Sequence, residues 1–152
     1  MATISLCMIV KNEEDHLARC LDSVEELVEE IIVVDTGSTD RTVEIASNYT
    51  SKVYSYEWKD DFSDARNYSF SKASMDYCMW MDADDVLEEA EHDRFIKLKQ
   101  SLPPETDIVM MKYHTSFDEA GKPSLSYYRE RWIRNSGQYR WIGAVHEVIP
   151  PN

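Results

Sequence analysis

The chain of 152 residues predicts an α/β fold with a mostly parallel sheet, flanking helices and an antiparallel C-terminal part. Two observations support this prediction. Up to residue 102, apolar runs alternate with segments whose apolar residues recur at helical spacing, which is the β-α-β order of a helix-covered parallel sheet. After that residue the pattern changes to extended segments, the first two separated by a Gly121-Lys122 turn, which favours antiparallel strands. These segments span residues 107–115, 124–135 and 139–149.

Four apolar runs supply the expected parallel strands. Residues 4–10 and 31–34 are almost unbroken, and the second run is β-branched, as in strands buried on both faces. Residues 52–58 alternate apolar with polar residues, which indicates a third strand. Residues 77–81 form a fourth buried run, and this run leads directly into a group of acidic residues.

Four helices are expected between and after these strands. Apolar residues recur at helical spacing over residues 17–28, and shorter helices are expected through residues 43–46 and 65–73. A charged helix from about Glu88 to Leu102 stops before two prolines. The expected capping residues are Ser38, Thr39 or Asp40 for the second helix and Ser63 or Asp64 for the third.

Composition and charge exclude several classes of function. The chain is 43% hydrophobic and 30% charged, which is a globular composition, and its net charge is -13. A chain this acidic lacks the excess of positive charge that binds nucleic acid or an anionic membrane surface. Cys7, Cys20 and Cys78 match no metal motif and are expected to be buried free thiols. With no signal-type segment and no transmembrane run, a cytoplasmic protein is expected.

Polar clusters follow three of the expected parallel strands. They span residues 11–13, 35–38 and 82–85. Ligands bind at the carboxyl ends of parallel strands in open α/β sheets, so these clusters mark the expected ligand edge. The G-x-G-x-x-G turn of dinucleotide-binding proteins and the P-loop are both missing from the sequence. A phosphate group would therefore have to be held by another route.

Asp82 and Asp84 supply such a route. Two carboxylates at positions i and i+2, at the tip of a buried strand, can both face one hard cation. Mg²⁺ and Mn²⁺ prefer oxygen ligands and are often held by one or two carboxylates together with substrate phosphates. An acidic loop exposed to solvent is the alternative for so short a motif. The apolar residues 79–81 directly before it favour the cation site.

Several segments together resemble the family-two glycosyltransferases. Residues 4–13, 31–42 and 77–85 are similar to that family's opening strand with its N-E, its V-V-D-x-G-S-T-D and its D-A-D-D segments, and residues 64–67 are similar to its A-R-N helix. The resemblance implies the Rossmann-like GT-A fold. It also implies one domain over residues 1–152, with a nucleotide-sugar half at 1–102 and an acceptor-side half at 103–152. Family members usually carry further acceptor-side structure, so a truncated chain is an open alternative.

The resemblance carries the nucleotide contacts onto particular residues. Asp35 matches the position that contacts the base or ribose, and Thr36 stands where many relatives have a second acid. Arg66 matches a basic position near the nucleotide, with a salt bridge to nearby acids as the alternative. The strand end that would line the nucleotide pocket consists of Ile9, Val10 and Lys11. Asp84 matches the direct ligand of Mn²⁺ or Mg²⁺. Asp82 matches a residue that contacts the ribose or binds the metal through water, and it is therefore also counted with the metal site.

The late G-x-x-H-E segment resembles bacterial family members related to lipopolysaccharide-core and peptide glycosyltransferases. It implies that Glu147 is the general base that deprotonates the acceptor and that His146 is a metal or phosphate ligand, although a surface pair remains an alternative. The aromatic residues of this half could stack on an acceptor sugar, but aromatics in so small a half are more often core. They are Trp132, Tyr139 and Trp141.

The expected function is a metal-assisted, inverting transfer of a sugar from a nucleoside diphosphate sugar, by resemblance UDP-linked, to an acceptor. That acceptor would be a glycan, a lipid-linked sugar or a peptide. A nucleotide-sugar-binding module without turnover is the main alternative. A nucleotidyltransferase is disfavoured because the glycine-rich, basic loop after the first strand is missing from the sequence. A receiver-type phospho-acceptor domain fits the D-x-D and the late His-Glu pair poorly.

Overall fold

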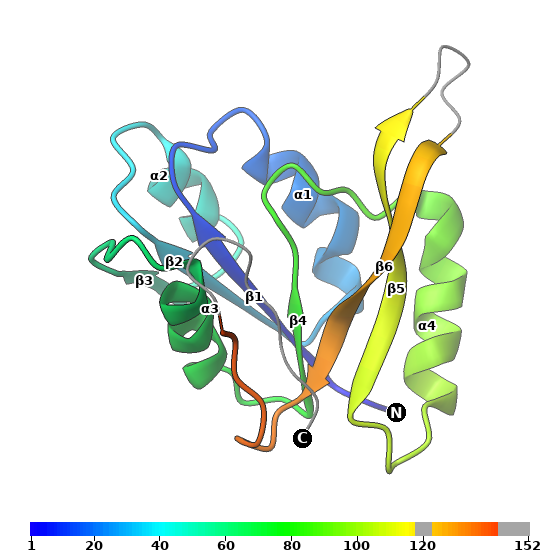
Figure 1. The fold of residues 1–152 in the computed structure, drawn as a ribbon. Helices are drawn as coiled ribbons and strands as arrows, with labels where there is room; N and C mark the ends of the chain where they lie inside the picture. Colours follow the sequence, from blue (N-terminus) through cyan, green and yellow to red (C-terminus); the bar gives the residue numbers. More distant parts are fainter. Residues whose placement is uncertain (118–122, 143–152) are drawn as a thin grey trace.

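The computed structural model describes residues 1–117 and 123–142. Six strands of this part form one mixed sheet in the order β3-β2-β1-β4-β6-β5 (Figure 1). Strands β1 to β4 are parallel to one another, and β6 runs antiparallel to both β4 and β5. The strands are β1 (Ile4–Val10), β2 (Glu30–Asp35), β3 (Val53–Ser55), β4 (Tyr77–Trp80), β5 (Ile108–Phe117) and β6 (Pro123–Arg134). The expected parallel sheet with an antiparallel C-terminal part is thus confirmed.

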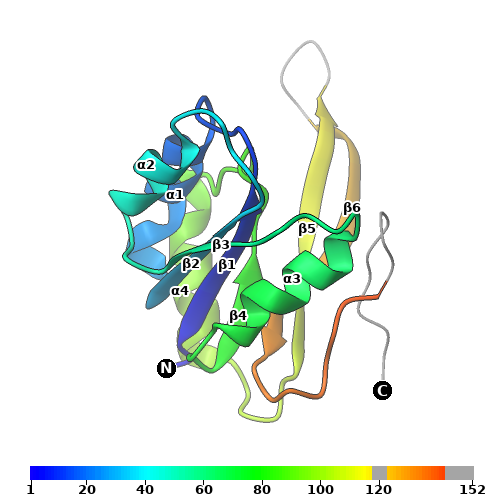
Figure 2. The same cartoon turned by 90° about the vertical axis from the view of Figure 1, so that its left-hand side faces the viewer.

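Helices cover both faces of this sheet. The α-helices are α1 (Leu17–Val24), α2 (Thr42–Ser47), α3 (Phe62–Ser71) and α4 (His92–Ser101). Short 3₁₀ turns, η1 (Glu25–Leu27) and η2 (Glu89–Glu91), follow α1 and precede α4. Helices α1, α2 and α4 lie on one face and α3 lies on the other (Figure 2). This two-sided cover explains why the central residues of β1 and β2 are almost all apolar.

Strand β1 contributes side chains to both halves of the core. Leu6 and Met8 lie in the cluster that includes Leu17 and Leu21 of α1. Cys7, pointing the other way, lies in the cluster that α3 covers. Because successive side chains of a strand alternate between its faces, one apolar run can serve both layers. All three cysteines are buried and free, as the sequence predicted.

Several element ends differ from their predictions. Helix α3 is capped by Asp61, whose side chain accepts a hydrogen bond from the Asp64 backbone N–H at 3.2 Å, so Ser63 and Asp64 are not its cap. Arg41 occupies the cap position of α2 and its side chain makes no capping bond, whereas Asp40, one of the expected caps, accepts from the Thr42 N–H at 2.9 Å. Strand β3 is shorter than the expected 52–58, and a 3₁₀ turn replaces the first residues of the expected fourth helix.

Within residues 1–117 and 123–142, none of the helices combines the length and the apolar character that crossing a membrane requires.

Candidate functional site

Two loops at the carboxyl ends of β1 and β2 are fastened to each other. The Asn12 backbone N–H donates to Ser38 Oγ at 2.9 Å, and the Asn12 side-chain oxygen accepts from the Thr39 N–H at 2.8 Å. Asn12 has a φ of 51°, a left-handed conformation that asparagine tolerates better than most residues. The Glu13 N–H donates to Thr42 Oγ1 at 2.8 Å. These bonds fix the edge of the sheet at which the sequence predicts ligand binding.

Asp35 ends β2 within this edge, beside Val10 of β1. Its residue surface is only 6% exposed, and its carboxylate accepts from the Gly37 N–H at 3.1 Å, from the Ser38 N–H at 3.0 Å and from Ser38 Oγ. A carboxylate offers about four acceptor positions, so one remains for a ligand. Thr36 is bound to the Val10 carbonyl through its N–H at 3.0 Å. The loop therefore holds Asp35 in one orientation.

The D-A-D-D segment forms a closed turn directly after β4. The Asp82 N–H donates to Asp85 Oδ2 at 2.9 Å, and the Asp85 N–H donates to the Asp82 carbonyl at 2.9 Å. One carboxylate oxygen from each of Asp82, Asp84 and Asp85 lies within 4.8 Å of the others. Asp84 is exposed and makes no hydrogen bond or ion pair with any other described residue. These oxygens are the ligand type that Mg²⁺ and Mn²⁺ prefer.

Two buried arginines hold the other two carboxylates of this turn. Arg66 of α3 donates to Asp82 Oδ1 at 3.2 Å, and its side chain is 7% exposed. Arg131 of β6 donates to Asp85 Oδ2 at 3.2 Å, and its side chain is 8% exposed. Hydrogen bonds between two charged groups are stronger than neutral ones. The predicted alternative for Arg66, a salt bridge to a nearby acid, is therefore present, and its partner is Asp82 of the D-x-D.

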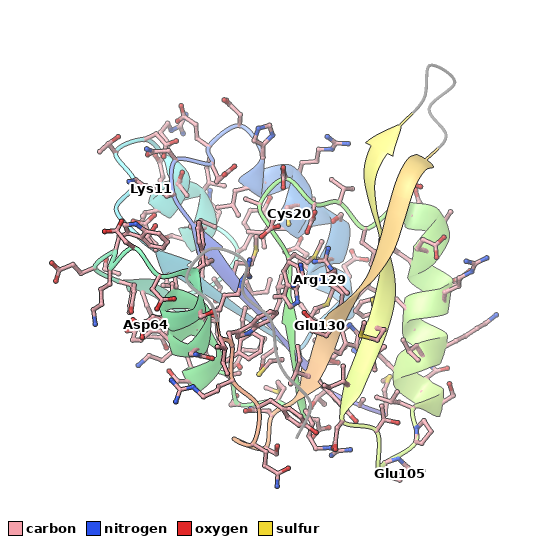
Figure 3. All side chains as sticks on the ribbon, viewed as in Figure 1. Lys11, Cys20, Asp64, Glu105, Arg129 and Glu130 are labelled. Atoms are coloured by element: carbon pink, nitrogen blue, oxygen red, sulfur yellow. The ribbon has the colours of Figure 1, made fainter. Side chains whose placement is uncertain are left out.

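Trp80 provides the surface on which these arginines lie. The guanidinium of Arg131 lies 3.9 Å from the Trp80 ring centroid, and that of Arg66 lies 4.6 Å from it. Arg129, which pairs with Glu130 at 3.0 Å, lies 5.3 Å from the same ring. Figure 3 places Arg129 and Glu130 on β6, with Lys11 and Glu105 at opposite ends of the sheet. Cation–π contacts thus add to the ion pairs at this edge.

The electrostatic environment at this edge is acidic. Burial raises the pKa of Glu13, and the charges of Asp84 and Asp82 raise it further against the opposing effect of His16. Burial likewise raises the pKa of Asp85, although Arg131 opposes that shift. The geometric closeness of these carboxylates is seen in the D-A-D-D turn, where oxygens of Asp82, Asp84 and Asp85 lie within 4.8 Å of one another. A divalent cation would relieve this repulsion, so the residues present fit a metal.

The remaining predicted residues lie at the same edge or outside the described part. Ile9 is half-buried, Val10 is buried and Lys11 is exposed, all at the carboxyl end of β1. His146 and Glu147 fall within residues 143–152, outside the described residues. Of the aromatics considered for sugar stacking, Trp132 and Trp141 are buried in the core, and Tyr139 is half-buried.

Sequence reasoning missed two contacts of this site. Asn67 of the A-R-N segment binds both backbone groups of Trp141, accepting from its N–H at 2.7 Å and donating to its carbonyl at 3.0 Å. Arg131 reaches the D-A-D-D turn from β6. The A-R-N pattern includes Asn67, but it gives no indication that Trp141 is its partner. For Arg131 the sequence offered only its position next to the apolar pair Trp132 and Ile133 in a strand that is otherwise rich in charged residues.

Comparison with known proteins shows several relatives. A TPR repeat-containing protein of Synechococcus elongatus is 37% identical over 151 residues, which are 98% of this chain and 36% of that protein. The prophage-derived glycosyltransferase SunS of Bacillus subtilis is 32% identical, over 95% of this chain and 34% of that protein. The lipopolysaccharide core biosynthesis glycosyltransferase LpsC of Rhizobium meliloti is 31% identical, over 97% and 57% respectively. The chain thus spans from about a third to somewhat over half of these relatives.

Solved structures agree on the fold. Glucosyl-3-phosphoglycerate synthase of Mycobacterium tuberculosis, in complex with uridine diphosphate, has a TM-score of 0.61 and 24% identity, over 76% of this chain and 46% of that one. TarS of S. aureus has a TM-score of 0.53 and 24% identity, over 64% and 32%. These likenesses show the GT-A arrangement alone. The model of the family described as Glycosyl transferase family 2 matches residues 5–150. The chain therefore belongs to glycosyltransferase family 2.

Proposed function

We propose that this chain binds a nucleoside diphosphate sugar at the carboxyl edge of its sheet and takes part in transferring the sugar to an acceptor. One observation carries the proposal: the D-A-D-D turn presents Asp84 to solvent while Arg66 holds Asp82 beside it. Membership of the family supplies the class of reaction. The chain spans only part of its relatives, so the activity of the whole protein is itself part of the proposal.

The residues at this edge have separate proposed roles in holding the donor. Asp35 accepts from the base or ribose at its remaining acceptor position, and Asp82 contacts the ribose while Arg66 fixes its orientation. Asp84 is the direct ligand of Mn²⁺ or Mg²⁺. When bound, that cation neutralises the diphosphate and makes it a better leaving group. The backbone at the end of β1 lines the nucleotide pocket, and it contains Ile9, Val10 and Lys11.

UDP is the proposed nucleotide. Its support is that solved relatives of this fold include a complex of glucosyl-3-phosphoglycerate synthase with Mg²⁺ and uridine diphosphate. The proposed acceptor is a hydroxyl or another nucleophile of a glycan, a lipid-linked sugar or a peptide. In an inverting reaction the acceptor attacks opposite the leaving nucleotide, and Glu147 is the proposed base, with His146 beside it as a metal or phosphate ligand.

A binding module without independent turnover is a second candidate. One observation favours it: this chain covers 36% of one relative and 34% of another, so acceptor contacts could come from elsewhere in a longer protein. Both candidates require the same donor site. They differ in one respect. With an acceptor present, a transferase releases the nucleoside diphosphate from the sugar donor, whereas a binding module does not.

Thermal unfolding with UDP, GDP, CDP or dTDP, each with and without Mn²⁺, tests the donor site. A ligand at a hundred times its Kd stabilises the fold by about 2.7 kcal/mol, which corresponds to a shift of a few degrees for a domain of this size. We expect one nucleotide to raise the midpoint only with Mn²⁺ present, and Asp84→Asn to abolish that shift. Asp93→Asn, at an exposed position of α4, is the matched control.

Two results would count against the proposal. A shift that survives in Asp84→Asn would remove that carboxylate from the donor site. The absence of any nucleotide-dependent shift in the unmodified chain would remove the site altogether. UDP release from UDP-sugars, measured with candidate acceptors, then separates the transferase from the binding module, because only the transferase turns over.

A further inference from the structure

The carboxylate of Asp85 occupies the centre of the D-A-D-D turn. Its Oδ2 atom accepts both the Asp82 backbone N–H, at 2.9 Å, and the Arg131 guanidinium, at 3.2 Å. The same nitrogen of Arg131 donates to the Trp80 carbonyl at 3.0 Å, at the last residue of β4. Arg131 therefore bonds to both ends of the chain segment that leaves the sheet and enters the turn.

These contacts separate Asp85 from Asp84, although both carboxylates lie in the same acidic cluster. For Asp85 to bind a cation through Oδ2 it would have to release the Asp82 N–H and the side chain of Arg131, and the same two bonds restrict how far its Oδ1 can turn toward a cation. The side chains of Asp85 and Arg131 are largely buried, and a buried charge that loses its partner is strongly destabilising. Asp84 has no such contact with the described residues and can meet a cation without rearrangement.

We propose that Asp85 and Arg131 are positioning residues, which fix the turn so that Asp84 faces the metal. This inference rests on the proposed function, because it concerns the same metal-dependent donor site. Asp85 shapes the turn from within, and Arg131 anchors it to β6, the strand that pairs with β4. The acceptor-side half of the chain thereby sets the geometry of the donor-side metal ligand.

The test measures Mn²⁺ affinity in the presence of saturating UDP, by electron paramagnetic resonance of free Mn²⁺. Partners that orient metal ligands typically contribute 10- to 100-fold to metal affinity. We expect Asp85→Asn to weaken Mn²⁺ binding about tenfold, because asparagine keeps an oxygen for the Asp82 N–H but loses the ion pair. Asp84→Asn should abolish binding. Glu44→Gln, which breaks the exposed pair with Arg41, should change nothing.

Arg131→Lys provides a second variant that keeps the buried positive charge. Lysine lacks the flat guanidinium that lies on the Trp80 ring while one of its nitrogens bonds to Asp85 and the Trp80 carbonyl, so we expect a loss similar to that of Asp85→Asn. In the double variant the two effects should not add, because both substitutions break one contact. A purely structural role would instead lower the unfolding midpoint and leave Mn²⁺ affinity of the folded fraction unchanged.

The Mn²⁺ affinities of these variants decide whether Asp85 and Arg131 position the turn. Unchanged Mn²⁺ affinity in Asp85→Asn and Arg131→Lys would overturn it. So would complete loss of binding in Asp85→Asn, equal to that of Asp84→Asn, because Asp85 would then be a ligand itself. An unmodified chain that binds no Mn²⁺ with UDP would refute the proposed function and this inference together, whereas normal binding with unaffected variants refutes only the inference.

Discussion

Replacing Glu30 by glutamine should make the stability of the domain depend less on pH. Glu30 begins β2, and its side chain is 2% exposed. Its carboxylate accepts from Ser5 Oγ at 2.7 Å, from Ser74 N–H at 2.9 Å, from Ser74 Oγ at 2.8 Å and from the ammonium of Lys52. Burial alone would raise the pKa of this group, but the hydrogen bonds from Lys52, Ser5 and Ser74 lower it to about 2.

The sign of the effect follows from this lowered pKa. A carboxylate with a lower pKa in the folded state stabilises the fold above its unfolded pKa, here 4.5, and this contribution is lost as the pH falls toward 2. A shift of this size corresponds to about 3 kcal/mol. The Lys52 side chain is 45% exposed, so solvent screens its part of the interaction. We therefore expect Glu30→Gln to cost about 2 kcal/mol at pH 7.

Urea unfolding of both proteins from pH 7 down to pH 3 measures this contribution. The difference in the free energy of unfolding between the unmodified chain and Glu30→Gln should be largest at pH 7 and should shrink by about half near pH 3. Glu57→Gln, at an exposed position after β3, is the control and should show no such trend. A difference that stays constant over this range would refute the argument, since it would arise from packing rather than from the charge.

Three further substitutions or reactions test contacts elsewhere in the fold. Asn67→Ala should cost about 2–3 kcal/mol in urea unfolding, because both backbone groups of Trp141 lose a partner, and equal stability of the variant would contradict this. Burial raises the pKa of Cys20 to about 12, so we expect iodoacetamide at pH 8 to label it only after unfolding, and rapid labelling of the folded chain would disprove this. Asp61→Ala should lower the free energy of unfolding by about 1 kcal/mol because the α3 cap is lost, whereas Asp61→Asn should keep the cap and most of the stability. Equal losses of stability in the two variants would exclude capping as the cause.

Patterns within one segment of sequence allowed the main elements to be predicted. The almost unbroken apolar runs at residues 4–10 and 31–34 identify strands covered on both faces, and the structure places helices on both faces. Element ends were less predictable, because several adjacent residues can cap a helix equally well. Helix α3 begins earlier than expected, so Asp61 rather than Ser63 or Asp64 accepts the backbone hydrogen bond.

The same distinction between local and distant contacts applies to the site. Asp35 is the last residue of β2, and Asp84 lies a few residues after β4, so their place at the predicted ligand edge depends mainly on where these strands end. The contact between Asp85 and Arg131 spans 46 residues, and that between Asn67 and Trp141 spans 74. These contacts depend on the pairing of β4 with β6 and on the path of the chain after β6. A one-residue slip of that register would turn Arg131 to the other face, so sequence spacing alone could not reveal it.

Trp80 links the first 102 residues of the chain to the residues after them. Its ring packs with Ile133 and Trp141 from the second half, and it carries Arg66 and Arg131 on its surface. Removing residues after 102 would expose this ring, leave β4 as an unpaired edge and remove the partner of Asp85. Such an edge is a site for association with other chains. The first 102 residues therefore depend on the residues after them for the conformation of the D-A-D-D turn.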